Sequence, residues 1–437
     1  MNVPALIRIL FVFSMVLVLN RLKWHLSLAL LVGSMVLSLW FGHGVTGSLE
    51  ILFRGALSLD TILLLAIIFQ ILSLAMLMNG TGMMERMIRS VRAIVPSRRM
   101  ALAMLPAMIG FLPMPGGAAV SAPLVDAADE ESKVDPLQKT AINYWFRHAW
   151  EYWWPLYPGV LLAFEISGLS LARFAAVEVP LTFFAILSGS LFLLLPLKLG
   201  PRKRRPEGKA RDLFFSFFPI LLLICLWAGL GYLLAGILGD GSGGGIWHEL
   251  LSARYFPMFL ALILVIAYVH IAGRADRTTW KEVFSNKKSF LLLLVVIGIK
   301  VFSYALETPL PDGGRIVEQV NTDLEQIHVP EILIVAMIPF ISGFVTGLAL
   351  GFVGASFPII IALAGQDAPT AQIMSYVVLA YGFGHMGMML SPVHICFLVT
   401  NEYFETSMVK AYRKLWGPVF GVFVGAILIS WLAWRFG

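Results

Sequence analysis

The sequence is poor in charge and in cysteine. Only 13% of its 437 residues are charged, whereas 59% are apolar, which exceeds the apolar share of an ordinary soluble domain. An ordinary soluble globular protein is therefore excluded. The two cysteines, Cys225 and Cys396, each lie within an apolar run, so no disulfide framework is expected.

Long apolar runs are present instead. The run from Leu213 to Leu238 exceeds the roughly 20 residues that a helix needs to cross the hydrocarbon core of a bilayer. The strands of membrane barrels are shorter and alternate in polarity, so the sequence predicts an all-α polytopic membrane protein. Ten simple spans are expected, at about 3–19, 25–41, 58–78, 141–163, 172–197, 213–239, 255–272, 289–304, 372–399 and 416–434.

The basic residues collect in short loops between the apolar runs. This is the positive-inside pattern, so the net charge of +6 indicates a lipid bilayer as the partner and no nucleic acid. The loop charges are consistent only if 100–126 and 331–364 each enter and leave the membrane on one side as re-entrant hairpins. We therefore expect a multi-pass protein of the cytoplasmic (inner) membrane with both termini outside.

The two halves of the chain match one another in order. "MLPAMIGF" (104–111) aligns with "MIPFISGF" (337–344), and "YWFRHAWEYWWP" (144–155) aligns with "YGFGHMGMMLSP" (381–392). Each half has five spans and one hairpin, and an odd number of spans inverts the second half relative to the first. The expected organisation is a repeat over 1–197 with its hairpin at about 100–126, a basic cytoplasmic linker over 198–212, and an inverted repeat over 213–437 with its hairpin at about 331–364.

Proline and glycine interrupt the first hairpin near its midpoint. Pro115, Gly116 and Gly117 cannot all continue a helix, so the tip must be non-helical and must face a cavity. A helix that restarts after Gly117 would point its N-terminal amides into that cavity, where an anion would be favoured. Ser121 follows in this helix and is expected at the same site.

The second hairpin is expected to turn near 351–356. Gly354 and Ser356 are its candidate substrate-binding residues, because Ser356 occupies the position that matches Ser121 in the first half. Close packing of helices through small residues explains the glycines equally well.

The helices that follow the hairpins are also expected to break. Pro155 and Pro158 lie near the middle of one, and Pro392 lies near the middle of the other. Broken helices at matching places in two inverted halves indicate a transport site near the membrane midplane. Ser391 and His394, on either side of Pro392, are therefore expected to bind substrate.

Ionisable residues precede the first break. Helical spacing would place Glu151 beside both Arg147 and His148, and charges inside a membrane are costly enough to indicate function. Arg147 is expected to bind a carboxylate with His148 beside it, and His148, Glu151 or the aligned His385 is expected to carry a coupling proton. An ion pair that only holds the helix in place is the alternative for Arg147 and Glu151, and a structural hydrogen bond is the alternative for the histidines.

Three motifs, "FLPMPGGAAVSAPLVD", "NYWFRHAWEYWWPLYPG" and "LSPVHICFLVTNEYF", resemble the signatures of a bacterial and archaeal membrane family of the ion transporter superfamily. That superfamily includes gluconate, citrate and dicarboxylate permeases. The resemblance implies two inverted repeats, a scaffold subdomain that forms a homodimer, and elevator-type secondary transport of organic anions coupled to sodium or protons. It places the tips at 115–121 and about 351–356, and the breaks at 147–158 and 391–394. The Ser-Asn-Thr tip motif of dicarboxylate members is absent.

The sequence thus predicts a secondary active transporter of a small organic anion of the carboxylate class. An anion channel would share the architecture. An intramembrane enzyme, with His148, Glu151 and His385 on a metal and Ser121 as nucleophile, is a further alternative, but the HExxH and GxSxG signatures are absent. No catalytic residue, resident metal or cofactor is therefore expected, and Na⁺ is considered only as a coupling ion.

Overall fold

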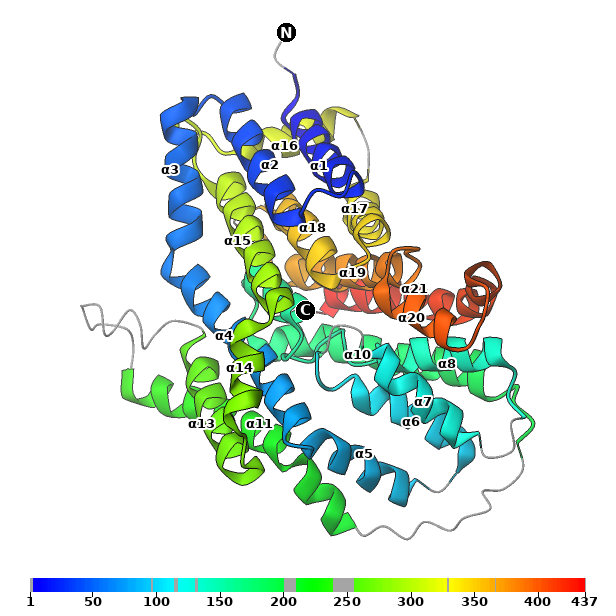
Figure 1. Ribbon diagram of the computed structural model, residues 1–437. Helices are drawn as coiled ribbons and strands as arrows, with labels where there is room; N and C mark the ends of the chain where they lie inside the picture. The colour runs from blue at the N-terminus through cyan, green and yellow to red at the C-terminus, as the bar shows by residue number, and fades with distance from the viewer. Residues whose placement is uncertain are drawn as a thin grey trace.

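The computed structural model describes residues 3–95, 97–113, 117–129, 133–199, 210–238, 255–327, 330–365 and 367–436, and all regular structure in these residues is helical (Figure 1). In chain order the helices are α1 (Ala5–Arg21), α2 (Leu26–Trp40), α3 (Gly44–Leu57), α4 (Leu59–Gly80), α5 (Met83–Ile94), α6 (Arg98–Ile109), α7 (Ala118–Ala128), α8 (Pro136–Arg147), α9 (Pro158–Ile166), α10 (Leu171–Gly189) with a π-helical continuation (Ser190–Leu194), α11 (Ala210–Leu238), α13 (Phe256–Gly273), α14 (Arg277–Ser285), α15 (Lys287–Glu307), α16 (Ile316–Ile327), α17 (Glu331–Thr346), α18 (Ala349–Ala364), α19 (Thr370–Met389), α20 (Ile395–Tyr403) and α21 (Met408–Phe436).

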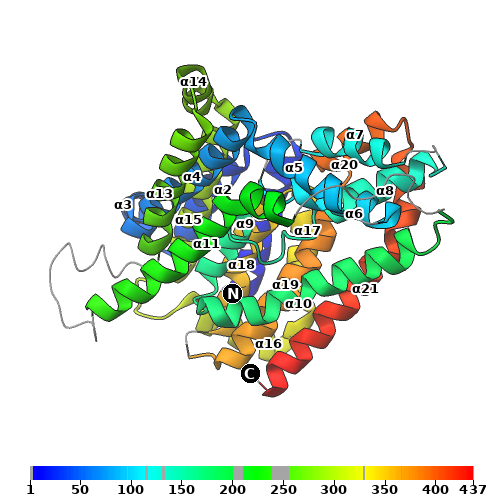
Figure 2. The same cartoon turned by 90° about the horizontal axis from the view of Figure 1, so that it is seen from below.

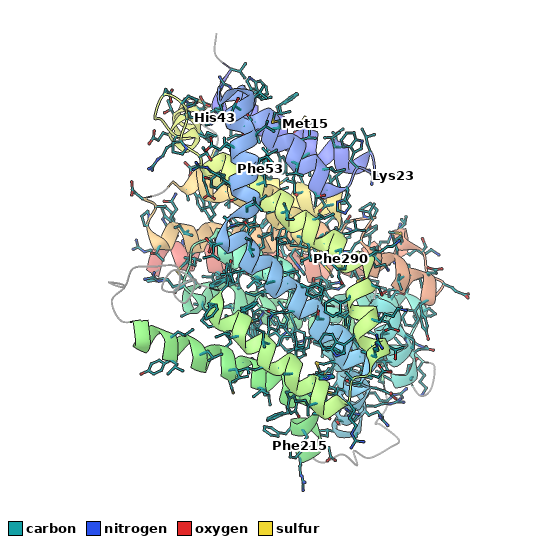
Figure 3. The ribbon with its side chains drawn as sticks, turned by 60° about the vertical axis from the view of Figure 1, so that its left-hand side comes forward. Met15, Lys23, His43, Phe53, Phe215 and Phe290 are labelled. Carbon is teal, nitrogen blue, oxygen red and sulfur yellow. The ribbon has the colours of Figure 1, made fainter. Side chains whose placement is uncertain are left out.

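Six helices in the described part of the chain are long and apolar enough to cross a membrane. They are α4, α10 with its continuation, α11, α13, α15 and α21. Their outer faces expose large apolar side chains, such as Phe290 of α15 and Phe215 of α11, and Figure 3 shows Phe215 near the lower edge of the molecule. Exposed apolar surface on this scale is unfavourable in water and favourable against lipid. The protein is therefore a membrane protein.

The expected spans are confirmed as helices, with two exceptions. The spans expected at 141–163 and 372–399 are not continuous, because α8 and α9 divide the first and α19 and α20 divide the second. Helices α3, α5, α14 and α16 lie where the sequence predicted loops. Helix α5 is amphipathic, with Met87 and Val91 buried and its arginines on the other face, so it has too few consecutive apolar residues to be predicted as a span.

Segments from the two halves of the chain pack together. Helix α7 contacts α20, α9 contacts α18, and α10 contacts α21. Figures 1 and 2 show α6, α7, α8 and α20 gathered in one part of the molecule, whereas α3, α4, α13 and α14 lie in another. Helix α15 packs against α3 and α4 of the second part and also against α2 and α18.

Both interrupted regions form a pair of packed helices. Helix α6 packs against α7, and residues 114–116 between them lie outside the described residues. Helix α17 packs against α18, and the two are joined by a turn at Gly347. Gly347 has a φ of +63°, a conformation that favours glycine. The expectation of a second tip at 351–356 is wrong, because those residues lie within α18. The alternative of close packing holds for Gly354, where a Cβ atom would lie 2.2 Å from Ile299.

Candidate functional site

The break between α8 and α9 brings Arg147, His148 and Glu151 together. Helix α8 ends at Arg147, so His148 and Glu151 do not lie on a helical face as predicted. Proline at 155 and 158 removes the amides that a continuous helix would need, and the chain bends instead. The bend still places Glu151 Oε1 3.8 Å from both Arg147 Nη1 and His148 Nε2. All three side chains are at least 94% buried, with exposed fractions of 2%, 2% and 6%.

Arg147 lies against the first hairpin. A Cβ atom on Gly117 would lie 2.3 Å from the Nη2 atom of Arg147, so the guanidinium occupies the space that a side chain would need. Gly117 directly precedes α7, which places the guanidinium beside the N-terminus of that helix. Pro115 and Gly116, also expected at this tip, lie outside the described residues. Ser121 is fully buried within α7, and its hydroxyl donates to the carbonyl of Ala118 at 3.4 Å.

The second break, between α19 and α20, also packs against the hairpin of its own half, formed by α17 and α18. The Ser391 hydroxyl donates to the Phe344 carbonyl at 2.6 Å. A Cβ atom on Gly347 would lie 3.0 Å from the backbone nitrogen of His394, so the turn of the hairpin touches the start of α20. Ser356 lies away from this turn, within α18, where its hydroxyl donates to the Phe352 carbonyl at 2.5 Å.

Two of the three candidate histidines meet directly. His148 Nε2 lies 3.2 Å from His394 Nε2, which comes from the other half of the chain. The Nδ1 atom of His148 lies 2.6 Å from the Tyr144 carbonyl. His385 contacts the ring of Tyr152, with ring centroids 4.5 Å apart, and it faces His148 across a void too narrow for water.

Aligned positions of the two halves make matching contacts. A Cβ on Gly110 would lie 2.1 Å from the Arg147 carbonyl oxygen, and a Cβ on the aligned Gly343 would lie 2.2 Å from the carbonyl oxygen of the aligned Gly384. The indole of Trp154 donates to Phe111 O at 2.9 Å, and the hydroxyl of the aligned Ser391 donates to the aligned Phe344 O. The backbones of both hairpins therefore pack against the breaks at the same aligned positions.

Aligned tyrosines connect the two breaks. The Tyr144 hydroxyl donates to the Met389 carbonyl at 2.9 Å, and the Tyr381 hydroxyl donates to the Glu151 carbonyl at 2.6 Å. Each hydroxyl thus donates a hydrogen bond to a carbonyl near the end of a broken helix in the other half. Such carbonyls have no partner within their own helix, and inside a membrane they must be paired within the protein.

The starts of four short helices lie around this centre. Helix α7 begins beside Arg147, and α20 begins beside Gly347. Helices α9 and α18 meet at their first turns, where a Cβ on Gly159 would lie 2.8 Å from the Cβ of Ala349. Helix N-termini carry partial positive charge, so their convergence with a guanidinium favours an anion.

The sequence analysis missed two residues of this centre. The Tyr157 hydroxyl donates to the Gly110 carbonyl at 2.5 Å and so holds α9 to the first hairpin. Cys396 brings its sulfur within 4.8 Å of the nearest ring nitrogens of His148 and His394. The only cue in the sequence is the His-x-Cys spacing after Pro392, which an apolar run conceals.

Known proteins resemble this chain in sequence family and in fold. The family model described as "Protein of unknown function (DUF401)" matches residues 5–435. No curated protein sequence matches. The fold is similar to that of the Alcanivorax borkumensis YdaH transporter, with a TM-score of 0.58, 12% sequence identity, and coverage of 90% of this chain and 89% of that one. At this identity the likeness shows a shared fold.

Proposed function

Because the chain belongs to the family described as "Protein of unknown function (DUF401)" and has a transporter-like fold, we propose that it is a secondary active transporter of a small organic anion of the carboxylate class. Its proposed setting is the cytoplasmic membrane. The observation that carries the proposal is the placement of the buried Arg147 guanidinium against Gly117 at the N-terminus of α7. A planar guanidinium can hold a carboxylate with two hydrogen bonds, and the amides of α7 add further donors.

We propose that the chain is built from two inverted repeats over 1–197 and 213–437 that work by an elevator-type mechanism. The matching contacts of Gly110 with Arg147 and of Gly343 with Gly384 support this organisation. Helices α6–α9 and α17–α20 would form the moving unit, because the hairpins pack against the breaks in each half. The remaining long helices would form the scaffold and the surface of a homodimer. Most of the linker over 198–212 lies outside the described residues.

The proposed coupling ion is a proton or Na⁺. Glu151 carries the argument for a proton, because its carboxylate lies 3.8 Å from both a guanidinium and an imidazole. Protonation of Glu151 or His148 would change the charge beside the substrate by one unit, which would link substrate binding to pH. His385 lines the same narrow void as His148, and its proposed part is that of a second proton carrier.

The first test measures the thermal stability of the purified protein against a panel of small carboxylates, sulfonates and inorganic anions, with Na⁺ or K⁺, at acidic and neutral pH. A ligand at 100 times its dissociation constant stabilises the folded state by about 2.7 kcal/mol, which is readily detected. A carboxylate that stabilises the protein is then followed in proteoliposomes. Uptake that saturates supports a carrier, whereas sustained conductance supports a channel.

The variant Arg147→Gln should abolish the stabilisation by the carboxylate. Because this change leaves Glu151 without its partner, the matched variant carries both Arg147→Gln and Glu151→Gln, which restores the charge balance of the buried centre. Arg54→Gln is the control, since Arg54 pairs with Glu50 at the same spacing on an exposed surface. A double variant that is folded and still binds the anion with unchanged affinity would refute the role of Arg147.

A further inference from the structure

Three residues that can ligate a metal meet beside the proposed anion site. One ring nitrogen of His148, one ring nitrogen of His394 and the Sγ atom of Cys396 all lie within 4.8 Å of one another. They come from two elements, since His148 follows the end of α8 whereas His394 and Cys396 lie at the start of α20. Both imidazoles are buried and Cys396 is partly buried.

The hydrogen bonding of His148 prepares it as a ligand. Its Nδ1 atom lies 2.6 Å from the Tyr144 carbonyl, which can only accept a hydrogen bond, so Nδ1 carries the proton. The Nε2 atom therefore presents its lone pair to His394. This arrangement, in which one ring nitrogen donates to a backbone carbonyl and the other faces the ion, is the usual one for metal-bound histidine.

The separation of the two imidazole nitrogens suits a tetrahedral ion. Two nitrogens that each lie about 2.0–2.1 Å from a tetrahedral Zn²⁺ are separated by about 3.3–3.4 Å. The observed separation of 3.2 Å between the two Nε2 atoms is close to this value. The alternative is a direct hydrogen bond between the histidines, in which His394 donates through Nε2. That tautomer leaves His394 Nδ1 as a buried acceptor, and no group in the described part of the chain donates to it with hydrogen-bond geometry.

Glu151 offers a candidate fourth ligand, an oxygen, and a balancing charge. Its Oε1 atom lies 3.8 Å from His148 Nε2, the same ring nitrogen that faces His394. Two imidazoles, a thiolate and a carboxylate form a mixed nitrogen, sulfur and oxygen set that selects transition metals over Na⁺, Mg²⁺ or Ca²⁺.

We propose that His148, His394 and Cys396 bind a transition-metal ion of the zinc type at the centre of the protein, with Glu151 as the adjacent carboxylate. This inference departs from the prediction that the protein has no metal site. It goes beyond anion transport, because none of the three ligands is needed to hold a carboxylate on Arg147, and a metal on His148 and Glu151 would leave His385 as the proton carrier of the proposed function.

The test uses the full chain, purified without a histidine tag and freed of metal with a chelator. Zn²⁺ binding is measured by titration calorimetry, and Co²⁺ is used as an absorbing substitute because only a thiolate ligand gives it an intense near-ultraviolet charge-transfer band. We expect one ion per chain, a charge-transfer band with Co²⁺, and loss of the band when Zn²⁺ is added.

The variants separate this site from adventitious binding. Cys396→Ser should abolish the band and weaken Zn²⁺ by about 100-fold or more, since loss of groups that merely orient metal ligands already costs about 10- to 100-fold. His394→Gln should weaken Zn²⁺ similarly and retain a free thiol. Cys225→Ser removes the exposed cysteine of α11 and should leave the Zn²⁺ affinity and the charge-transfer band unchanged.

Two results would overturn the inference. One is the absence of stoichiometric Zn²⁺ or Co²⁺ binding to the folded wild-type protein, which needs no variant to be interpreted. The other is a charge-transfer band that persists in Cys396→Ser. The metal titrations contain no carboxylate, so they are independent of the anion test. A protein that binds Zn²⁺ as expected but is not stabilised by any carboxylate in the thermal-stability test would count against the proposed function alone.

Discussion

The close approach of Gly110 to Arg147 predicts a severe effect for a single added methyl group. A Cβ atom at Gly110 would lie 2.1 Å from the Arg147 carbonyl oxygen, whereas Cβ atoms in real structures do not approach within 3.0 Å. The backbone at Gly110, after the end of α6, and the backbone at Arg147 must therefore separate by about 0.9 Å. The clash cannot be relieved by a side-chain rotation, because both contacting groups belong to the backbone. Overpacking typically costs about 1–3 kcal/mol, and a clash with backbone belongs at the upper end of this range.

The measurement is the free energy of unfolding of Gly110→Ala in mixed detergent micelles, together with the midpoint of thermal unfolding. Gly343→Ala should lose a similar amount, because its Cβ would lie 2.2 Å from the Gly384 carbonyl oxygen. Gly229→Ala is the control, since Gly229 lies inside α11 with no atom within 4 Å of an added Cβ. That change should stabilise the protein by about 0.4–1 kcal/mol, as alanine is favoured over glycine in a helix.

The reasoning fails if Gly110→Ala unfolds with the same free energy as the wild-type protein while Gly229→Ala behaves as expected. A large loss in Gly110→Ala with no loss in Gly343→Ala would refute the equivalence of the two contacts, and with it the main support for the inverted repeats. Substrate binding adds a second readout. A displaced α6 moves the tip away from the Arg147 guanidinium, so carboxylate affinity should fall even in protein that stays folded.

Two further predictions concern ion pairs outside the centre. Lys300 of α15 donates a hydrogen bond to Glu165 of α9 across a largely buried interface. Glu165→Gln leaves the buried ammonium without its partner and should lower the free energy of unfolding by about 3–5 kcal/mol, whereas the double variant with Lys300→Met should recover most of that loss. Additive losses of the two changes in thermal unfolding would contradict this coupling. In the loop after α7, burial opposes the charge of Asp129, but hydrogen bonds from the Val134 amide and from Lys139 outweigh it and lower the pKa of Asp129. A carboxyl group whose pKa is lowered by folding adds stability that is complete above its ordinary pKa of about 3.9 and is lost as the pH falls through its folded-state pKa. Asp129→Asn should therefore be less stable than the wild-type protein at neutral pH. It should also lose less stability than the wild-type protein when the pH falls below about 4. Unfolding midpoints measured from acidic to neutral pH check this, and an acid loss equal to that of the wild-type protein would rule it out.

The helices and their interruptions could be predicted because their causes are local. Apolar length predicted the membrane helices, and Pro155, Pro158 and Pro392 predicted where two of them break, since proline acts on its own backbone. The end of α8 at Arg147, well before Pro155, was beyond such reasoning. It depends on contacts from other elements, such as the bond from Tyr381 to the Glu151 carbonyl.

The second tip was misplaced because glycine has two roles in a membrane helix. Gly347 adopts a positive φ at the turn, whereas Gly354 makes room for Ile299 of α15. Both appear in the sequence as a glycine in an apolar run, and only the fold distinguishes them. Cys396 was missed for a related reason, since its value as a ligand comes from His148, which lies in the other half of the chain.

The two breaks differ at the position that holds the guanidinium in the first half. Gly384 aligns with Arg147, and a Cβ atom there would lie 2.4 Å from the ring of Phe352. A side chain at Gly384 would require the Phe352 ring to move or to be replaced by a smaller side chain, so an arginine at this position would need a second, compensating change. The packing of Phe352 therefore restricts the guanidinium to the first of the two aligned positions.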